Sequence, residues 1–366
     1  MAGYKQTEVG VIPDDWKAPK IGECLKICHG KNQKEVESIN GEYPILGTGG
    51  EIGKAKTPLY SKPSVLIGRK GTIDAPRYIE TPFWTVDTLF YSEVFSNSLP
   101  KYLFYQFCMV DWYSYNEASG VPSLNARTIE KIAIPKPPTM AEQEAIAEAL
   151  SDADALIESL EKLVEKNRQI KQGTMQELLT GKKRLTEFSE EWLEKPLGEI
   201  STINKGSQLD NSKTIVHGNF PYLNGGITPS GFADKSNTPR NTIAISEGGN
   251  SCGYVQFMSE SFWCGGHCYS VTAERLDNHF LYHALKSAES LIMGLRVGSG
   301  LPNVQKKALL RFKLRFPRVR EEQAAIATIL SDMDAELTTL EKKLTKAHHI
   351  KQGMMQELLT GRIRLV

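Results

Sequence analysis

Residues 142–185 read EQEAIAEALSDADALIESLEKLVEKNRQIKQGTMQELLTGKKRL, and residues 322–365 read EQAAIATILSDMDAELTTLEKKLTKAHHIKQGMMQELLTGRIRL. The two stretches are identical at 27 of 44 positions, at a constant offset of 180 residues in a chain of 366. Solenoid repeats are much shorter, at roughly 20–50 residues. The long period therefore predicts two copies of a whole domain with its connector, related by a pseudo-two-fold axis. Such a protein suits a target with two like halves, of which duplex DNA is the commonest.

Both copies carry apolar residues at alternating steps of four and three, which is the seam of a coiled coil. A helix of about 38 residues, about 57 Å long, is expected in each copy. Gly181 and Gly361 suit the C-caps of these helices, and Gly173 and Gly353 mark a candidate bend in each. The predicted seam residues are Ile146, Leu150, Ile157, Leu160 and Val164, and Ile326, Leu330, Leu337, Leu340 and Leu344.

Two apolar stripes in one chain can bury each other as an intramolecular antiparallel coiled coil with one globular domain at each end. Pairing of the helices between two chains is the alternative arrangement. The intervening segments are β-rich, with short apolar stretches such as 66–73 and 243–249 broken by glycine turns. Short helices are expected at 100–110 and 278–292. The predicted class is α/β (α+β), with globular domains at 1–139 and 186–319 and helical spacers at 140–185 and 320–366.

Shorter echoes link the two globular segments. The stretch 43–50 is echoed by 220–226, and SGVPS at 119–123 is echoed by SGLPN at 299–303. The C-terminus breaks off at Arg364-Leu365, where the N-terminal pattern around Thr7 and Trp16 resumes. We therefore predict a pseudo-circular chain whose termini are adjacent. A shared fold with divergent side chains is what two recognition domains for different DNA sequences would show.

Composition is that of an ordinary globular protein, with 40% hydrophobic and 24% charged residues and a net charge of +1. No secretory leader and no apolar run of about 18 residues is present, so a cytoplasmic protein with no membrane partner is expected. Its six cysteines are then expected to be reduced thiols. The cluster of Cys264, His267 and Cys268 offers metal ligands, but its counterpart at 85–89 has none. This mismatch favours plain strand residues, and no metal site is predicted.

Motifs for catalysis are missing from the sequence. An adenine methyltransferase holds its flipped base with a Pro-Pro-aromatic tetrapeptide led by Asn or Asp, whereas the one Pro-Pro here lies between Lys136 and Thr139. No GxxxxGK[ST] loop for ATP occurs either. The sequence therefore favours a non-catalytic recognition protein with no catalytic residues and no cofactor of its own.

Base reading requires Arg, Lys, Asn or Gln side chains that reach base edges, with other basic groups on phosphates. Such residues lie on glycine-rich loops in both halves, and a run from 306 to 320 has basic but no acidic side chains. A solvated loop position is the alternative for each residue taken singly. The predicted DNA-binding residues are Lys31, Asn32, Lys34, Lys54, Arg69, Lys70 and Arg77 in the first half, and Asn204, Lys205, Asn224, Lys235, Arg240, Asn250, Lys306 and Lys307 in the second.

The whole layout resembles the specificity subunit of Type I restriction–modification systems. The resemblance is carried by the Glu-Gln pairs that open both long helices, the KQGxMQELLTG stretches at 171–181 and 351–361, the SGxP loops, and the N-terminal segment 7–16. It implies two target-recognition domains that each read half of a bipartite site in double-stranded DNA, with a helical spacer that docks two methyltransferase subunits. S-adenosylmethionine and ATP with Mg²⁺ would then belong to partner subunits only, and restriction subunits are a further partner class.

Two other functions remain open at this point. The chain could be a helical scaffold for partner proteins whose globular ends do not read DNA. It could also be an enzyme with an unrecognised site, although the missing motifs argue against that. Sequence cannot decide which bases are read, because readout depends on loop conformation and on DNA deformability.

Overall fold

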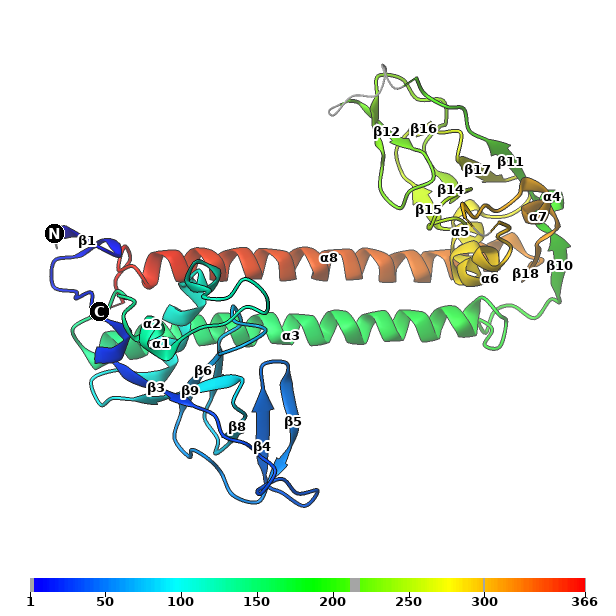
Figure 1. Cartoon of the computed structure of the whole chain (residues 1–366). Helices are drawn as coiled ribbons and strands as arrows, with labels where there is room; N and C mark the ends of the chain where they lie inside the picture. Colours follow the sequence, from blue (N-terminus) through cyan, green and yellow to red (C-terminus); the bar gives the residue numbers. More distant parts are fainter. Residues whose placement is uncertain (1–2, 211–217, 299, 366) are drawn as a thin grey trace. The chain divides into compact units, whose positions relative to one another are not determined.

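The computed structural model describes residues 3–210, 218–298 and 300–365, so Ser299 of the second SGxP stretch lies outside the described residues. The chain forms two compact units. Unit 1 comprises Met1–Glu161 and Lys342–Val366, and unit 2 comprises Lys162–Glu341. Each unit holds one globular domain together with part of both long helices (Figure 1). The two ends of the chain therefore belong to the same unit, as the pseudo-circular pattern predicted.

The globular domain of unit 1 is a small mixed α/β structure. Its strands are β1 (Tyr4–Thr7), β2 (Gly10–Pro13), β3 (Leu25–His29), β4 (Tyr43–Gly47), β5 (Gly50–Ala55), β6 (Ser64–Gly68), β7 (Arg77–Ile79), β8 (Trp84–Thr85) and β9 (Leu89–Val94). Its helices are η1 (Ile21–Glu23), α1 (Pro100–Met109), η2 (Trp112–Tyr115) and α2 (Ala126–Glu130). An antiparallel sheet of order β3-β9-β6-β7 lies beside a three-stranded sheet of order β5-β4-β8, in which β4 and β8 run parallel.

Unit 2 repeats the topology of these two sheets. Its strands are β10 (Trp192–Pro196), β11 (Ser201–Lys205), β12 (Phe220–Leu223), β13 (Gly231–Ala233), β14 (Thr242–Ser246), β15 (Val255–Met258), β16 (Trp263–Cys264), β17 (Cys268–Ala273) and β18 (Lys313–Pro317). Its helices are α4 (Leu197–Ile200), α5 (Asn278–Ser287), α6 (Glu289–Gly294) and α7 (Lys306–Arg311). The sheets have orders β11-β17-β14-β15 and β13-β12-β16, and β12 and β16 again run parallel.

The two long helices are α3 (Met140–Leu178) and α8 (Arg320–Leu358), each of 39 residues. Both run without interruption through Gly173 and Gly353, so neither glycine breaks its helix. Both are followed by a glycine in the left-handed region, Gly181 at φ 71° and Gly361 at φ 73°, where a side chain would be strained. The sequence repeat thus extends to the backbone geometry of the helix ends.

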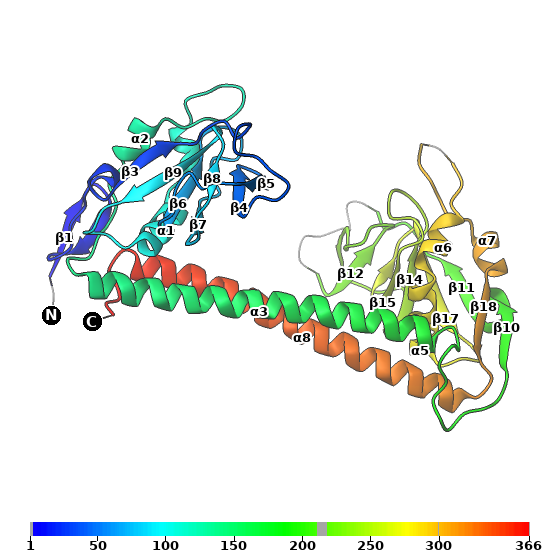
Figure 2. The same cartoon turned by 90° about the horizontal axis from the view of Figure 1, so that it is seen from below.

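Within each unit, the segments of α3 and α8 pack antiparallel. In unit 1, Lys351 forms an ion pair with Asp154, and in unit 2 the equivalent Lys171 forms one with Asp334. The residue numbers of the paired positions rise along α3 as they fall along α8, which is the pattern of antiparallel helices. Figure 2 shows the ribbons of α3 and α8 side by side. Of the predicted seam residues, the following are buried: Ile146, Leu150, Ile157, Val164, Ile326, Leu330, Leu337 and Leu340.

Leu160 and Leu344 are only half-buried. Ile146 and Leu150 join the core of unit 1, and Ile326 and Leu330 join the core of unit 2, so these side chains are covered by a globular domain as well as by the partner helix. Leu160 and Leu344 belong to neither core. The same is true of four seam residues that are nevertheless buried, so membership of a core does not explain the difference; they are Ile157, Val164, Leu337 and Leu340.

In each unit, an arginine that follows the end of one long helix forms an ion pair with a glutamate at the start of the other. Arg364 donates to both carboxylate oxygens of Glu142, whose side chain is 1% exposed, and its guanidinium carbon lies 5.7 Å from the Trp16 ring centroid. Arg364 also donates two hydrogen bonds of 2.9 and 3.0 Å to Asp15, and these hold the pKa of the Asp15 carboxyl below its usual range. The junction of the chain ends is therefore an ordered contact.

Unit 2 contains the equivalent ion pair. Arg184 donates to Glu322 at 2.7 and 2.8 Å, and the Glu322 side chain is also 1% exposed. The Arg184 guanidinium carbon lies 5.9 Å from the ring centroid of Trp192. Both junctions therefore share the arginine–glutamate pair and the nearby tryptophan, as the matching sequences predicted. They differ in the preceding segment, because residues 10–13 form strand β2 whereas residues 186–191 form no strand.

We expect Arg364→Ala to lower the free energy of unfolding by about 3–5 kcal/mol, because the substitution leaves the buried Glu142 carboxylate without its partner. Arg184→Ala should have a similar effect through Glu322. The matched control is Arg362→Ala, which removes an exposed ion pair to Glu357 and should cost less than about 1 kcal/mol. Urea denaturation followed by tryptophan fluorescence measures all three. Equal losses in Arg362→Ala and Arg364→Ala would contradict the assignment.

Candidate nucleic-acid interface

In unit 1, loops from distant parts of the sequence meet where their strands end. The Lys31 N–H donates to the Thr85 carbonyl at 2.8 Å, and the Arg69 N–H donates to the Thr88 carbonyl at 2.8 Å. The Gly71 N–H donates to the Pro122 carbonyl at 2.9 Å, which attaches the SGVP loop. We call this arrangement the first loop cluster, and it consists of residues 30–33, 47–50, 69–72, 86–88 and 119–123.

Unit 2 builds the same arrangement from the same backbone hydrogen bonds. Ser207 donates to Cys264 at 3.0 Å, Glu247 to His267 at 2.9 Å, and Gly249 to Pro302 at 3.0 Å. This second loop cluster consists of residues 205–208, 224–226, 247–251, 265–267 and 300–303. It encloses a pocket of about 460 Å³, lined among others by Asn224, Gly248, Ser251, His267 and Asn303.

Five predicted DNA-binding residues belong to or hold the first loop cluster. Lys31, Arg69 and Lys70 lie on its loops, and Arg77 at the start of β7 donates to the Gly47 and Thr48 carbonyls. Arg77 is therefore committed to holding the loop after β4. Of the others, Asn32 lies on the first of these loops and accepts from the Lys34 N–H at 3.0 Å, while Lys54 on β5 pairs with Glu51 at 2.9 Å.

In the second loop cluster, Lys205 and Asn250 are exposed, whereas the Asn224 side-chain oxygen already accepts from the His267 N–H at 3.1 Å. The remaining predicted residues lie outside the cluster as defined. Asn204 is exposed on β11, Lys235 and Arg240 are exposed on the segment between β13 and β14, and Lys306 and Lys307 are exposed on the first turn of α7. Helix α7 begins two residues after Val304, whose N–H donates to the Glu247 carbonyl at 2.8 Å.

The side chains on this shared frame differ most at one equivalent pair of positions, Arg69 and Glu247. Arg69 donates from Nη1 to the Asp87 carbonyl at 3.2 Å. Glu247 accepts from Lys205 Nζ at 2.7 Å and from the Tyr269 hydroxyl at 2.8 Å. Burial, and then the bond to Glu247, raise the pKa of Tyr269, so its hydroxyl stays a donor.

Sequence reasoning missed the roles of Glu247 and Tyr269, because neither residue is basic or an amide. The signal that could have found Glu247 was the alignment of the stretches 66–73 and 243–249, which places an acid opposite Arg69.

The cysteine cluster in unit 2 behaves as core. Cys264 and Cys268 are buried in a small apolar cluster with Leu223 and Phe262. The hydrogen bond with Cys264, together with burial, raises the pKa of the Cys268 thiol. Within residues 3–210, 218–298 and 300–365, no group of three or more His, Cys, Asp or Glu side chains is placed to hold a metal ion.

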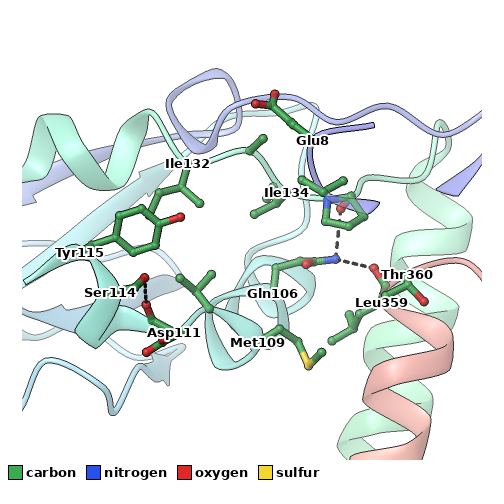
Figure 3. A pocket seen from close by; sticks show the side chains of 14 residues that line it. Glu8, Gln106, Met109, Asp111, Ser114, Tyr115, Ile132, Ile134, Leu359 and Thr360 are labelled. Carbon is green, nitrogen blue, oxygen red and sulfur yellow. Dashed lines mark hydrogen bonds between the residues drawn. The ribbon is translucent and has the colours of Figure 1, made fainter. Parts of the chain in front are cut away.

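A second hollow lies where α8 ends against the globular domain of unit 1 (Figure 3). Gln106 lies at its edge and donates to the carbonyls of Pro135 at 3.1 Å and Leu359 at 3.0 Å. The equivalent place in unit 2 has Ala284 and Leu179 in its lining. We interpret each hollow as the junction between the end of a long helix and the globular domain of the same unit. Among the described residues, none of the helices has both the length and the apolar character needed to cross a bilayer.

Comparison with known families gives a match to both halves of the chain. The family model described as "Type I restriction modification DNA specificity domain" matches residues 13–172 and again 189–347. The specificity subunit of the MjaVIII Type I restriction enzyme of Methanocaldococcus jannaschii is 24% identical over 402 residues, covering 97% of this chain and 94% of that relative. A protein of Mycoplasma genitalium described as a type I specificity subunit is 35% identical over 152 residues. That match covers 41% of this chain and 39% of the relative's length.

Solved structures support the fold. The crystal structure of a Type I restriction–modification S subunit from M. genitalium superimposes with a TM-score of 0.76 at 20% identity, covering 94% of this chain and 96% of that chain. A chain from a study of complex assembly and conformational transition in a type I restriction–modification system superimposes with a TM-score of 0.51 at 14% identity, covering 96% of this chain and 99% of that chain. The arrangement of two like domains with long helices is therefore one already seen in solved proteins.

Proposed function

Because this chain belongs to the family of Type I restriction–modification DNA specificity subunits, we propose that each loop cluster reads one half of a bipartite site in double-stranded DNA. The observation that carries the proposal is the pair of loop clusters, which share their backbone hydrogen bonds but differ in side chains. A shared frame gives both clusters one geometry toward a duplex, and different side chains give each its own sequence preference. Arg69 against Glu247 is the clearest such difference.

We propose that α3 and α8 act as the spacer that fixes the distance between the half-sites. Both helices are continuous and are locked by matched ion pairs, Lys351 with Asp154 and Lys171 with Asp334. A stiff, internally paired rod holds a set length, whereas a flexible linker would tolerate many. The repeated surface of the spacer also suits two copies of one partner, and we propose two methyltransferase subunits. Assembly with other subunits is the subject of the structural study of the related type I system.

We further propose that this chain contributes recognition and no chemical step. The sequence lacks the Pro-Pro-aromatic tetrapeptide of adenine methyltransferases and the phosphate-binding loop of ATPases. Methyl transfer from S-adenosylmethionine, and any ATP- and Mg²⁺-dependent step by restriction subunits, would then belong to partner subunits. Partners that act on chromosomal DNA are found in the cytoplasm of a prokaryotic cell, and we propose the same location for this chain.

Methylome sequencing of cells with and without this chain tests the proposal. We expect methylated adenine in one bipartite motif, with two short defined half-sites separated by unread bases, and we expect the motif to vanish when the chain is deleted. The methyltransferase genes stay intact in both strains, so loss of the enzyme itself cannot explain the difference. A motif that persists without the chain, or a single contiguous motif, would contradict the proposal.

A further inference from the structure

Arg69 and Glu247 occupy equivalent positions, because their backbones make the same hydrogen bonds in the two units. In unit 1 the Leu124 N–H donates to the Arg69 carbonyl at 2.9 Å, and in unit 2 the Val304 N–H donates to the Glu247 carbonyl at 2.8 Å. Each residue follows the central strand of its sheet by one position, Arg69 after β6 and Glu247 after β14. The two clusters thus place an arginine and a glutamate at the same point of the frame, with opposite charge.

A cation nevertheless faces solvent in both clusters. The Glu247 side chain is only 12% exposed, while the Lys205 side chain that it binds is 52% exposed. Glu247 therefore lies beneath Lys205 and presents the ammonium group outward. The Arg69 side chain is 34% exposed, donates to the Asp87 carbonyl, and lies 4.0 Å from the Asp87 carboxylate, which is 72% exposed.

The cation lies at different positions in the two clusters because two neighbouring residues differ between the units. The counterparts of Lys205 and Tyr269 in unit 1 are His29 and Phe90, by the pairing of β11 with β17 and of β3 with β9. His29 and Phe90 pack edge to face with their ring centroids 4.9 Å apart. Phe90 has no hydroxyl that could donate to a carboxylate. In unit 1 the cation is Arg69, the loop residue that directly follows β6.

The hydrogen-bond capacity of both cations matches guanine. A lysine ammonium has three donors, of which Lys205 uses one on Glu247, so two remain. Arginine has five N–H donors, and one of them binds the Asp87 carbonyl in Arg69. Guanine presents two acceptors, O6 and N7, in the major groove, and Arg or Lys on these atoms is the commonest specific contact. A cation that is already oriented loses less conformational freedom on binding.

We propose that Arg69 and Lys205 each read a guanine, Arg69 in the half-site of unit 1 and Lys205 in the half-site of unit 2. Glu247 and Tyr269 are positioning residues that aim Lys205, with the Tyr269 hydroxyl also 3.1 Å from the Val304 carbonyl. This inference rests on the proposed bipartite recognition and names the residues that carry part of it. Lys205 and Tyr269 both donate to the same Glu247 oxygen, Oε1, so the tyrosine hydroxyl helps to fix the carboxylate that holds the lysine.

The test is the binding of the full chain, assembled with its methyltransferase subunits, to duplexes in which each base pair of the site is changed in turn. We expect Lys205→Gln to lose about 10- to 100-fold of the discrimination for one guanine in the second half-site, and Arg69→Gln to do the same in the first. Lys205→Arg should retain the preference for that guanine. Arg275→Ala is the matched control, since it removes an exposed cation of unit 2 outside the second loop cluster.

Glu247→Gln and Tyr269→Phe separate positioning from folding. Both should weaken discrimination at the same guanine as Lys205→Gln while leaving the first half-site unchanged, whereas a merely misfolded domain would lose all preferences of its half-site. A uniform loss of affinity on every duplex in Lys205→Gln would overturn the proposal, because it would identify a phosphate contact. An altered preference at a base other than guanine would overturn it as well. The wild-type complex is measured first, so a failure of bipartite recognition itself shows there.

Discussion

A chain in which residues 196–298 replace residues 20–118 should recognise its second half-site twice. The variant carries a second copy of residues 196–298, which hold four of the five segments of the second loop cluster, on unchanged helices. Because the helices of the repeat run antiparallel, the two identical half-sites should form an inverted repeat with the original spacer length. We expect methylation at the wild-type motif to be lost completely and a new symmetric motif to be methylated in its place.

The structure gives the reason why this replacement should fold. In unit 1 the Gln143 side-chain oxygen accepts from the Leu99 N–H at 2.9 Å, and in unit 2 the equivalent Gln323 accepts from the Asp277 N–H at 2.8 Å. At the first graft point, the backbone bond from Leu197 to Phe312 has the same length, 2.8 Å, as the bond from Ile21 to Ile132. The helices therefore offer the same attachment points to either domain.

Contacts deeper in the attachment are matched as well. Tyr105 on α1 donates to Asp154 at 2.8 Å, and the equivalent His283 on α5 lies 3.0 Å from Ser331 and 4.0 Å from Asp334. In the variant His283 would meet Ser151 and Asp154, which are the same residue types. The reciprocal variant, with residues 20–118 in both places, is the control and should recognise the first half-site twice. A variant that folds but still methylates the wild-type motif would show that the domains do not read independently.

The sequence repeat was sufficient to predict the two long helices, the shared topology of the globular domains and the adjacency of the chain ends. These features follow from local periodicity and from comparing the chain with itself, since Glu142 and Glu322 or Arg184 and Arg364 occur in matching contexts. The burial of most seam residues followed from the same periodicity. The half-exposure of Leu160 and Leu344 did not, because the apolar spacing at these two positions is the same as at the buried ones.

The contacts among the loop residues could not be predicted from the sequence, for a physical reason. Lys205 and Glu247 are 42 residues apart, and only the folded sheet brings β11 beside β17 and β17 beside β14. Composition marked Arg77 as a candidate DNA contact, whereas its guanidinium is committed to loop carbonyls. Residue type alone cannot separate a side chain that holds a loop from one that the loop presents to a ligand.

Seven residues inserted after Val164 in α3, together with seven inserted after Leu344 in α8, should lengthen the spacer and leave both half-sites unchanged. The two insertion points are equivalent in the repeat and lie between the ion pairs His348–Glu161 and Arg168–Glu341. Seven residues keep the apolar stripe within about 20° of its original direction, so the seam should re-form. They add about 10.5 Å of helix, which corresponds to about three base pairs of B-DNA.

Two control variants test whether the effect comes from helix length. Five residues inserted at both points turn the apolar stripe by about 140°, which breaks the seam and should abolish methylation at every spacing. Seven residues inserted in α3 alone leave two helices of unequal length, so the ion pairs on one side of the insertion cannot form together with those on the other. We expect that variant to lose methylation at the wild-type motif.

The methylome of cells that carry the wild-type chain or the double seven-residue insertion measures the spacing directly. If the helices set the distance between two independent recognition domains, both strains show the same two half-sites, and the unread gap is longer by about three base pairs in the insertion strain. The same gap in both strains, with methylation intact, would contradict this account, and so would any change in the bases of either half-site.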